Sequence, residues 1–262
     1  MSKRPLIMGV LNITPDSFSD GGAYSSLQKV LLQIEKLVEQ GADIIDVGAE
    51  SSRPGSSAVS VDEEWARLEP VLKSLDKWPE VIFSLDSYKD EIIERALSYK
   101  IDIINNIKGL SSKETLDKIN KKKLSYISMH IHGELKTMQE SPISSLQESK
   151  KVLDILKKDF QVLKNVGFSE DRIFLDPGIG FGKDDRANLL LLKMSMEKSK
   201  KLPLLVGVSR KSFIGRLLDI DQPLMRDNPS KMLEICLMMA GVKIIRTHAV
   251  EQLAKMRDLI YN

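Results

Sequence analysis

The chain contains a single cysteine, which excludes an internal disulfide framework. Cys236 lies within the apolar pattern of residues 232–240, so we expect it to be a buried residue of a helix. Histidine is nearly as scarce, with 3 residues. His130 and His132 would share one face of a strand, but barrel metallohydrolases use more histidines and carboxylates than this chain easily supplies. We therefore do not expect a zinc centre.

An excess of charge is also missing, as are long apolar stretches. The chain has 39 Lys and Arg against 37 Asp and Glu, a net charge of +2, so no overall field favours nucleic acid or a membrane surface. The apolar residues after Lys3 and Arg4 are interrupted at residues 12–16, too early for a signal peptide, and no later stretch could span a bilayer. We expect a cytoplasmic protein without a membrane or nucleic-acid partner.

What the sequence does contain is a series of short apolar runs, each ending on polar residues. Buried parallel strands have this composition, and in α/β barrels the chemistry is located at the carboxyl ends of the strands. The runs are Leu6–Leu11 before Asn12, Val81–Leu85 before Asp86, Ile101–Ile104 before Asn105, Ile173–Leu175 before Asp176, Leu204–Val208 before Ser209–Lys211, and Val242–Ile245 before Arg246 and His248. These polar side chains are predicted to converge on one rim.

About eight strand-plus-helix units follow one another, with no linker between them. The first helical pattern runs from Leu27 to Val38 and stops at Gly41, and the next strand begins at Asp43. Strands that alternate with helices pair in parallel through right-handed crossovers. At 262 residues the chain has the length of one (β/α)8 TIM barrel, which we predict as the fold. The alternative is a doubly wound open sheet, which normally needs fewer units.

Two long loops follow the first two strands. Residues 12–22 contain turn formers and one apolar residue, Phe18, which is also compatible with an ordinary surface loop. Residues 50–56 combine hydroxyls with Arg53 and Gly55, the components of an anion clamp, or else a capped turn before a helix that starts near Asp62.

Three further segments carry candidate site residues. The segment 175–183 fits neither the P-loop nor the dinucleotide glycine spacing, and it retains a strand-end carboxylate, Phe181 and Lys183. Two cations precede a helix at residues 209–212, which is unfavourable unless an anion binds there, and the last strand of a barrel is a recurrent phosphate site. The methionines are expected in the core or at a subunit contact; they are Met225, Met232, Met238, Met239 and Met256.

In their order along the chain, these segments resemble the dihydropteroate synthase family from Met8 to about Val250. The matching pieces are MGVLNITPDSFSDGG, ESSRPGS, SLDS, INN, MH with GELKTMQ, LDPGIGFGK, LLVGVSRKSFIG and IIRTH. The resemblance implies a single pterin-binding (β/α)8 barrel over residues 1–262, usually a homodimer, with long first and second βα loops. It also implies an enzyme that joins a dihydropterin pyrophosphate to p-aminobenzoate and releases pyrophosphate with Mg²⁺.

The resemblance assigns roles to residues at the matching positions. It implies catalytic roles for Asp86, Lys211, Arg246 and His248, and a pterin site of Asp86, Asn105, Met129, Asp176 and Lys211. It implies a pyrophosphate site of Asn12 with Mg²⁺, Ser52, Arg53, Arg246 and His248. The p-aminobenzoate pocket, where sulfonamides would compete, would consist of Phe18, Pro54, Phe181 and Ser212.

The chain departs from the family pattern at several positions. Ser52 replaces a usual Thr and keeps the hydroxyl, and Ile131–His132 replaces Met-Gln. Asn106 and Ala249 each replace an Asp, and we expect both changes to remove negative charge from the rim, the second also a helix cap. The alternatives are therefore a pterin-dependent methyltransferase, a silent paralogue that still binds pterin, and a barrel aldolase that uses Lys211 as a Schiff-base nucleophile.

Overall fold

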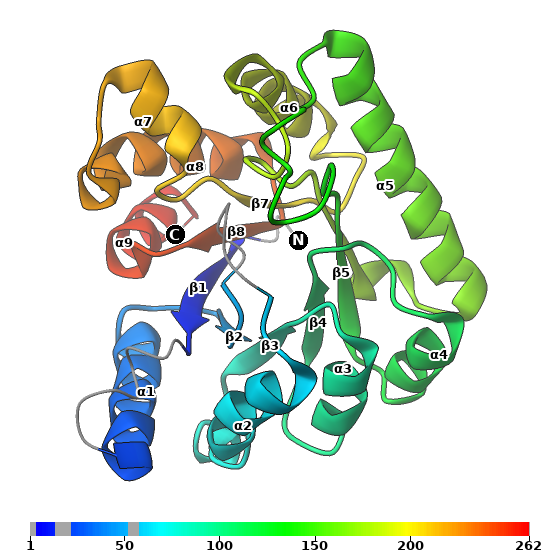
Figure 1. The fold of residues 1–262 in the computed structure, drawn as a ribbon. Coiled ribbons are helices and arrows are strands. Elements are labelled where there is room, and N and C mark those ends of the chain that lie inside the picture. Colours follow the sequence, from blue (N-terminus) through cyan, green and yellow to red (C-terminus); the bar gives the residue numbers. More distant parts are fainter. Residues whose placement is uncertain (1–3, 14–21, 52–57, 262) are drawn as a thin grey trace.

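The computed structural model describes residues 4–13, 22–51 and 58–261, with the backbone alone at 22–26. In this part of the chain, eight parallel strands form one sheet in the order β6-β5-β4-β3-β2-β1-β8-β7. A parallel bridge from Leu175 to Leu204 joins the two ends of the sheet and nearly closes it. Figure 1 shows the helices arranged around these central strands. The fold is the predicted (β/α)8 barrel and not an open sheet.

The strands agree closely with the predicted apolar runs. They are β1 (Leu6–Asn12), β2 (Ile44–Gly48), β3 (Ile82–Asp86), β4 (Ile103–Asn106), β5 (Ser125–Met129), β6 (Ile173–Asp176), β7 (Leu205–Gly207) and β8 (Ile244–Thr247). The helices are α1 (Gly22–Glu39), α2 (Val61–Leu72), α3 (Asp90–Ala96), α4 (Lys113–Lys121), α5 (Leu146–Val166), α6 (Asp185–Lys198), α7 (Ser212–Leu218), α8 (Asp227–Ala240) and α9 (Val250–Tyr261). Short 3-10 turns are η2 (Leu75–Lys77), η3 (Glu170–Arg172) and η4 (Pro223–Arg226).

Glycine ends several of the helices, as the helix–glycine–strand pattern predicts. Gly167 after α5 and Gly241 after α8 have φ angles of 106° and 95°. These left-handed conformations strain residues that carry a Cβ, so glycine stops the helix and turns the chain into the next strand.

The barrel interior is layered, because alternate residues of each strand point inward. A lower layer is apolar and consists of Met8, Ile44, Ile103, Ile127, Leu205 and Ile244. One step towards the carboxyl ends, the register places Asp46 beside Val10 and Ser84, and Arg246 beside Gly207. Inward-facing residues thus change from apolar to polar at the end of the barrel where the chemistry is expected. A second, larger apolar cluster fills the space between the strands and the helices.

The outer face of α8 corrects two expectations. Cys236 is exposed and not buried. Met225, Met232 and Met239 are 65%, 70% and 68% exposed, so only Met238, which is fully buried, fills the core in the predicted way. The sequence pattern is misleading because α8 is apolar on its outward side as well as its inward side. Among the described residues, no helix combines the length and apolar composition needed to cross a bilayer.

Candidate active site

A cavity of about 590 Å³ lies at the carboxyl ends of the strands. All ten predicted site residues that the structure describes line it: Asn12, Asp86, Asn105, Met129, Asp176, Phe181, Lys211, Ser212, Arg246 and His248. The four others, Phe18, Ser52, Arg53 and Pro54, lie outside the described residues. The convergence follows from parallel pairing, which brings the ends of sequence-distant strands together at one rim.

Arg246 forms the centre of the polar layer beneath this cavity. Its Nη2 atom is 2.9 Å from Asp86 Oδ2, and its Nε atom is 2.7 Å from Asp46 Oδ2. Burial raises the pKa of Asp86 to about 7, the charge of Asp46 raises it further, and the Arg246 guanidinium opposes both effects. Asp86 is thus a carboxylate whose charge is sensitive to its surroundings near neutral pH.

Asp46 is the site residue that the sequence analysis missed. Its side chain is fully buried, and Oδ2 also accepts a hydrogen bond of 3.1 Å from Asn105 Nδ2. The available signal was a charged residue inside the apolar run 44–47, where a buried strand does not need one.

The opposite side of the cavity holds Asp176 and Lys211. Burial raises the pKa of Asp176, while the Gly178 N–H, which donates to Oδ1 at 2.7 Å, and the Lys211 charge lower it. Burial and the nearby Arg246 charge lower the pKa of Lys211 to about 8. Lys211 Nζ lies 4.1 Å from the Phe181 ring centroid, a cation–π contact that orients both side chains. A buried carboxylate and a buried ammonium group therefore face the same space.

Lys183 supports the loop after β6. It is fully buried and donates hydrogen bonds to the carbonyls of Phe181 at 2.7 Å and His130 at 3.1 Å. Burial lowers its pKa to about 7. The loop passes so close to His130 that a Cβ on Gly178 would lie 2.0 Å from the His130 carbonyl oxygen. Lys183 therefore holds the backbone that carries Asp176 and Phe181.

The two histidines follow β5 and do not belong to the strand. His132 is exposed, whereas burial and the Lys183 charge lower the pKa of His130 to about 3, so its ring is neutral. Among the described residues, no group of three or more His, Cys, Asp or Glu side chains could hold a metal ion.

The segment after β7 contributes one free cation to the site where two were expected. Arg210 adopts a left-handed backbone conformation, with φ of 58°, and its guanidinium binds both oxygens of Asp227 at 2.6 and 2.9 Å. Its charge is therefore largely neutralised. Ser209 Oγ accepts from the His248 backbone N–H at 3.1 Å and lies 3.0 Å from the ring Nδ1, which fixes His248 at the cavity.

The structure changes the meaning of the two departures from Asp. Asn106 is buried and donates to the Tyr126 hydroxyl at 3.0 Å, on the side of β4 opposite to Asn105. The expectation that this change removes charge from the rim is therefore wrong. Ala249 precedes α9, where its own N–H donates to Thr247 Oγ1 at 3.1 Å, and it has no side-chain oxygen to cap the helix.

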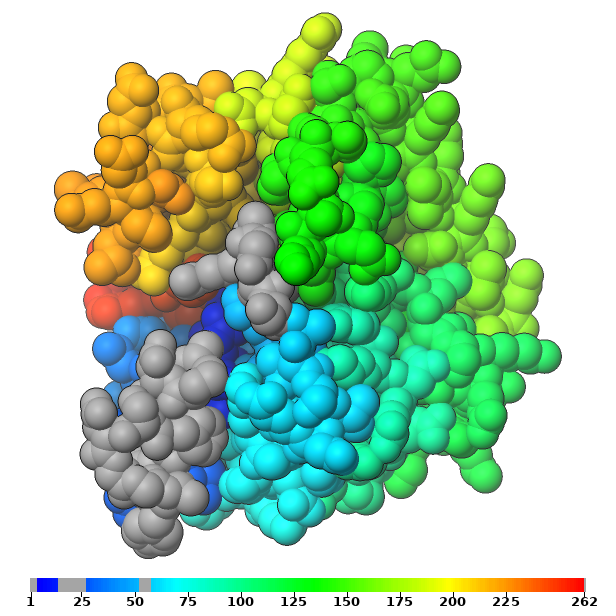
Figure 2. Space-filling view, viewed as in Figure 1, coloured from blue at the N-terminus to red at the C-terminus, as the bar shows by residue number. Residues whose placement is uncertain are grey.

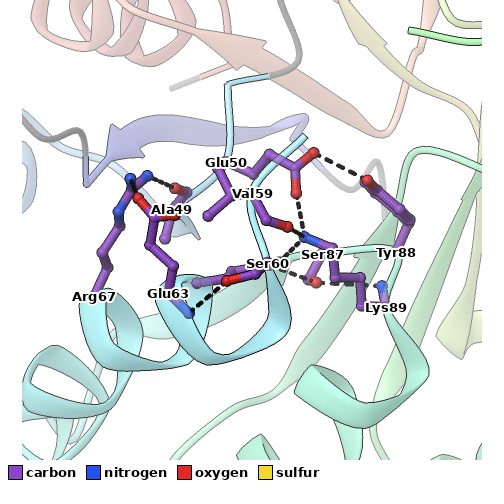
Figure 3. A network of polar contacts seen from close by, with 10 residues as sticks. Ala49, Glu50, Val59, Ser60, Glu63, Arg67, Ser87, Tyr88 and Lys89 are labelled. Carbon is purple, nitrogen blue, oxygen red and sulfur yellow. Dashed lines mark hydrogen bonds and ion pairs between the residues drawn. The ribbon is translucent and has the colours of Figure 1, made fainter. Parts of the chain in front are cut away.

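A second polar network fixes the residues that flank the β2–α2 connection (Figure 3). Lys89 Nζ binds the Glu50 carboxylate, the Val59 carbonyl at 2.6 Å and Glu64 Oε2 at 2.5 Å. Tyr88 donates to Glu50 at 2.9 Å, and Ser87 donates to Glu64 at 2.7 Å. Glu50 and Ser87 immediately neighbour the cavity residues Ser51 and Asp86, so this network braces one edge of the site.

The fold and the site together define a (β/α)8-barrel enzyme with a strongly polar cavity at the carboxyl ends of its strands. A family model described as "Pterin binding enzyme" matches residues 8–248. The dihydropteroate synthase of Escherichia coli (strain K12) is 39% identical over 250 residues, which cover 95% of this chain and 88% of that relative. The enzyme of the same name from Synechocystis sp. is 37% identical over 268 residues, 99% of this chain and 91% of the relative.

Solved structures agree with these matches. The Xanthomonas albilineans dihydropteroate synthase with 4-aminobenzoic acid superposes with a TM-score of 0.88, at 30% identity, over 99% of this chain and 93% of that one. The Yersinia pestis dihydropteroate synthase in a sulfonamide drug complex also has a TM-score of 0.88, at 35% identity, over 99% and 94% of the two chains. The chain belongs to the pterin-binding enzymes and, among them, to the dihydropteroate synthase family of transferases.

Proposed function

We propose that the protein condenses 6-hydroxymethyl-7,8-dihydropterin pyrophosphate with p-aminobenzoate, which forms 7,8-dihydropteroate for folate biosynthesis and releases pyrophosphate. The observation that carries this proposal is the division of one cavity into two halves. Asp176 and Asn105 offer hydrogen-bonding groups for a heterocycle, whereas Arg246 and His248 offer donors for an anion. One substrate that contains both a pterin and a pyrophosphate fits this division.

The pterin ring is an aminopyrimidinone whose edge carries adjacent donors and acceptors. Asp176 accepts from its ring N–H and exocyclic amine, Asn105 binds the neighbouring edge, and Lys211 donates to a ring oxygen or nitrogen. Met129, which is 4% exposed, packs on the ring face. Because these groups lie in a buried, low-dielectric site, each polar contact with the ring is stronger than it would be in water.

Cleavage of the C–O bond to pyrophosphate leaves positive charge on the pterin methylene and negative charge on the leaving group. Asp86 stabilises the cation, and Arg246, His248, Ser52 and Arg53 hold the leaving group. Interactions that strengthen as charge develops lower the barrier, and one well-aligned donor contributes about 2.7–4 kcal/mol in comparable sites. The p-aminobenzoate amine is neutral near pH 7, so orientation of this nucleophile suffices and no strong base is required.

Magnesium is part of the proposal, with Asn12 as its protein ligand. Asn12 presents an amide oxygen, a hard donor, at the cavity. Mg²⁺ normally keeps several waters and is held by few protein groups together with substrate phosphates, so a single oxygen ligand fits this ion. When bound, the ion supplies positive charge to the pyrophosphate.

For the second substrate, we propose a pocket formed by Phe18, Pro54, Phe181 and Ser212. Phe181 and Ser212 line the described cavity, and the other two lie outside the described residues. Because sulfonamides resemble p-aminobenzoate in ring and acidic group, they are expected to compete for this pocket, and added p-aminobenzoate should relieve the inhibition.

A homodimer is supported by one apolar surface. Its exposed side chains come from four consecutive elements: Leu189 of α6, Leu217 and Leu218 of α7, Leu224 and Met225 of η4, and Met232 and Met239 of α8. Figure 2 shows the segment of α7 and η4 in orange, projecting from one side of the molecule. Large exposed apolar patches mark protein contacts, and a second copy of the chain can bury the same patch on both subunits. A cytoplasmic location agrees with the single free cysteine.

The test is pyrophosphate release from purified protein given the dihydropterin pyrophosphate and Mg²⁺, with and without p-aminobenzoate. We expect release that depends on the amine and falls at least about 100-fold in Asp86→Ala and Arg246→Ala. Arg216→Ala is the matched control, because Arg216 pairs with Asp185 on the helical exterior. Absence of release despite measurable pterin binding would contradict the proposal and favour the silent paralogue.

A further inference from the structure

The two halves of the cavity share one buried oxygen atom. Asp46 Oδ2 accepts from Arg246 Nε at 2.7 Å and from Asn105 Nδ2 at 3.1 Å. These three side chains come from β2, β8 and β4, and Asp46 is fully buried among them. Arg246 belongs to the pyrophosphate half and Asn105 to the pterin half, so Asp46 contacts the binding groups of both.

The chemistry of a carboxylate determines how Asn105 presents itself. A carboxylate only accepts hydrogen bonds, so Asn105 must turn its NH₂ group towards Asp46. Its carbonyl oxygen Oδ1 is then the atom left for a ligand, and it can only accept. Asn105 therefore offers an acceptor to a ring N–H.

Asp46 also determines the direction of the Arg246 guanidinium. The guanidinium is a rigid planar fork, so fixing Nε fixes its plane. With Nε on Asp46 and Nη2 on Asp86 at 2.9 Å, Arg246 is held from two sides. A planar donor set held in this way meets phosphoryl oxygens in one orientation, which a single flexible contact would not ensure.

Stability alone gives no reason for a carboxylate at this position. Its second oxygen, Oδ1, is buried and has no hydrogen-bonding partner among the described residues, which is unfavourable. A buried ion pair is often no more stable than well-packed apolar residues of similar volume. The layer directly below is apolar, so an apolar residue at this position would continue the core.

We propose that Asp46 is a positioning residue that aligns Arg246 for the pyrophosphate and Asn105 for the pterin ring. The proposal rests on the proposed function for the identity of the two ligands. Asp46 itself touches neither ligand and acts through the two side chains that it holds.

The sign of one binding change separates positioning from simple electrostatics. Asp46→Asn removes a negative charge next to Arg246, so if Asp46 acted only through its charge, an anion would bind more tightly. If it positions Arg246, the anion loses an aligned donor set and binds more weakly. We expect the Kd of pyrophosphate with Mg²⁺, measured by isothermal titration calorimetry, to rise about tenfold, and kcat/KM to fall about 100-fold.

Asp43→Asn is the matched control. Asp43 lies just before β2 at the opposite end of the barrel, where it pairs with Arg257 and accepts the Ile7 N–H at 2.8 Å. The same substitution there breaks a buried Arg–Asp pair far from the cavity, so a similar loss of melting temperature is expected with an unchanged Kd for pyrophosphate. A general effect of loosening would weaken binding in both variants.

Unchanged or tighter pyrophosphate binding in a folded Asp46→Asn variant overturns the proposal. If that variant does not fold, Asp46→Ser, which also removes the charge and occupies less space, provides the same comparison. The two proposals fail in different ways. Wild-type protein that binds pyrophosphate but never releases it from the dihydropterin substrate contradicts the proposed function, and the binding comparison still tests Asp46.

Discussion

Two side chains of the cavity are expected to change charge close to neutral pH. The pKa of Asp86 is raised to about 7, mainly by burial and the Asp46 charge, and that of Lys211 is lowered to about 8, mainly by burial and the Arg246 charge. Asp86 stabilises the pterin cation only when ionised, and Lys211 donates best when protonated. We therefore predict a bell-shaped dependence of kcat/KM on pH, falling below about 7 and above about 8.

Initial rates of pyrophosphate release between pH 5.5 and 9.5 would measure this profile. Lys211→Arg is the informative variant, because arginine stays protonated throughout the range and the decline above pH 8 should disappear. A decline that persists in Lys211→Arg at the same pH would show that another group is responsible.

At the level of single residues, the sequence predicts identity better than direction. The strand-end residues Asp86, Asn105 and Asp176 were recognised because a polar residue interrupts an apolar run. Asp46 was missed because its inward position in mid-strand follows from the register with β1 and β3. Arg210 was misinterpreted because a left-handed backbone turns its side chain towards Asp227, which no local pattern shows.

At the level of elements, the Lys89 network joins β2, α2 and the start of α3. Glu64 is 1% and Glu50 7% exposed at their side chains, and both depend on Lys89 for charge compensation. Lys89→Met leaves two buried carboxylates without a cation, so we expect the free energy of unfolding to fall by about 3–5 kcal/mol in urea denaturation.

Lys73→Met is the control for this prediction, because Lys73 pairs with Glu69 in a largely exposed i,i+4 contact and should leave stability nearly unchanged. Adding Glu64→Gln to Lys89→Met should restore part of the stability. Equal effects of Lys73→Met and Lys89→Met would mean that the network contributes no more than a surface pair.

Helix α8 contains a buried carboxyl group that the proposed reaction does not use. Burial raises the pKa of Glu234 to about 7, which the nearby Thr247 hydroxyl only partly offsets. Because the folded pKa exceeds the ordinary value of 4.5, the unfolded chain loses its proton first as pH rises. Stability is therefore lost between about pH 4.5 and 7, by up to about 3 kcal/mol.

We predict that Glu234→Gln stabilises the protein at pH 8.5 relative to wild type, by about 2 kcal/mol, and gives no gain at pH 4.5. Urea denaturation at the two pH values would measure the difference. Glu197→Gln on the exposed side of α6 is the control, with no change expected at either pH. A stabilisation that does not depend on pH would show that Glu234 is already protonated at pH 8.5.

The elements themselves were largely predictable, for a physical reason. Parallel strands buried on both faces are continuous apolar runs, and glycine after a helix marks its end, so β1, β3, β6 and α5 could be located from the sequence. The outer face of α8 could not be predicted, because an apolar residue that faces solvent looks the same in sequence as one that faces the core. Cys236 and Met232 show this ambiguity.

At the level of the whole molecule, the same apolar surface determines the expected assembly. We predict that Met232→Glu with Met239→Glu converts the homodimer to a monomer, because both side chains, 70% and 68% exposed, would place charges in the buried interface. Sedimentation velocity would measure the change. Leu32→Glu is the control, because Leu32 is 61% exposed on α1, outside this surface. Wild-type protein that sediments as a monomer would contradict the homodimer.

The barrel closes least completely between β6 and β7. Among the described residues, these two strands are joined by the single Leu175–Leu204 bridge and a 3.0 Å bond from the Leu175 N–H to the Pro203 carbonyl, whereas the other neighbours pair along their length. Asp176 ends one of these strands, and Lys211 follows the other. A pterin held by both residues would act as a cross-link over the weakest joint of the cylinder, so that the substrate completes the wall of the container in which it reacts.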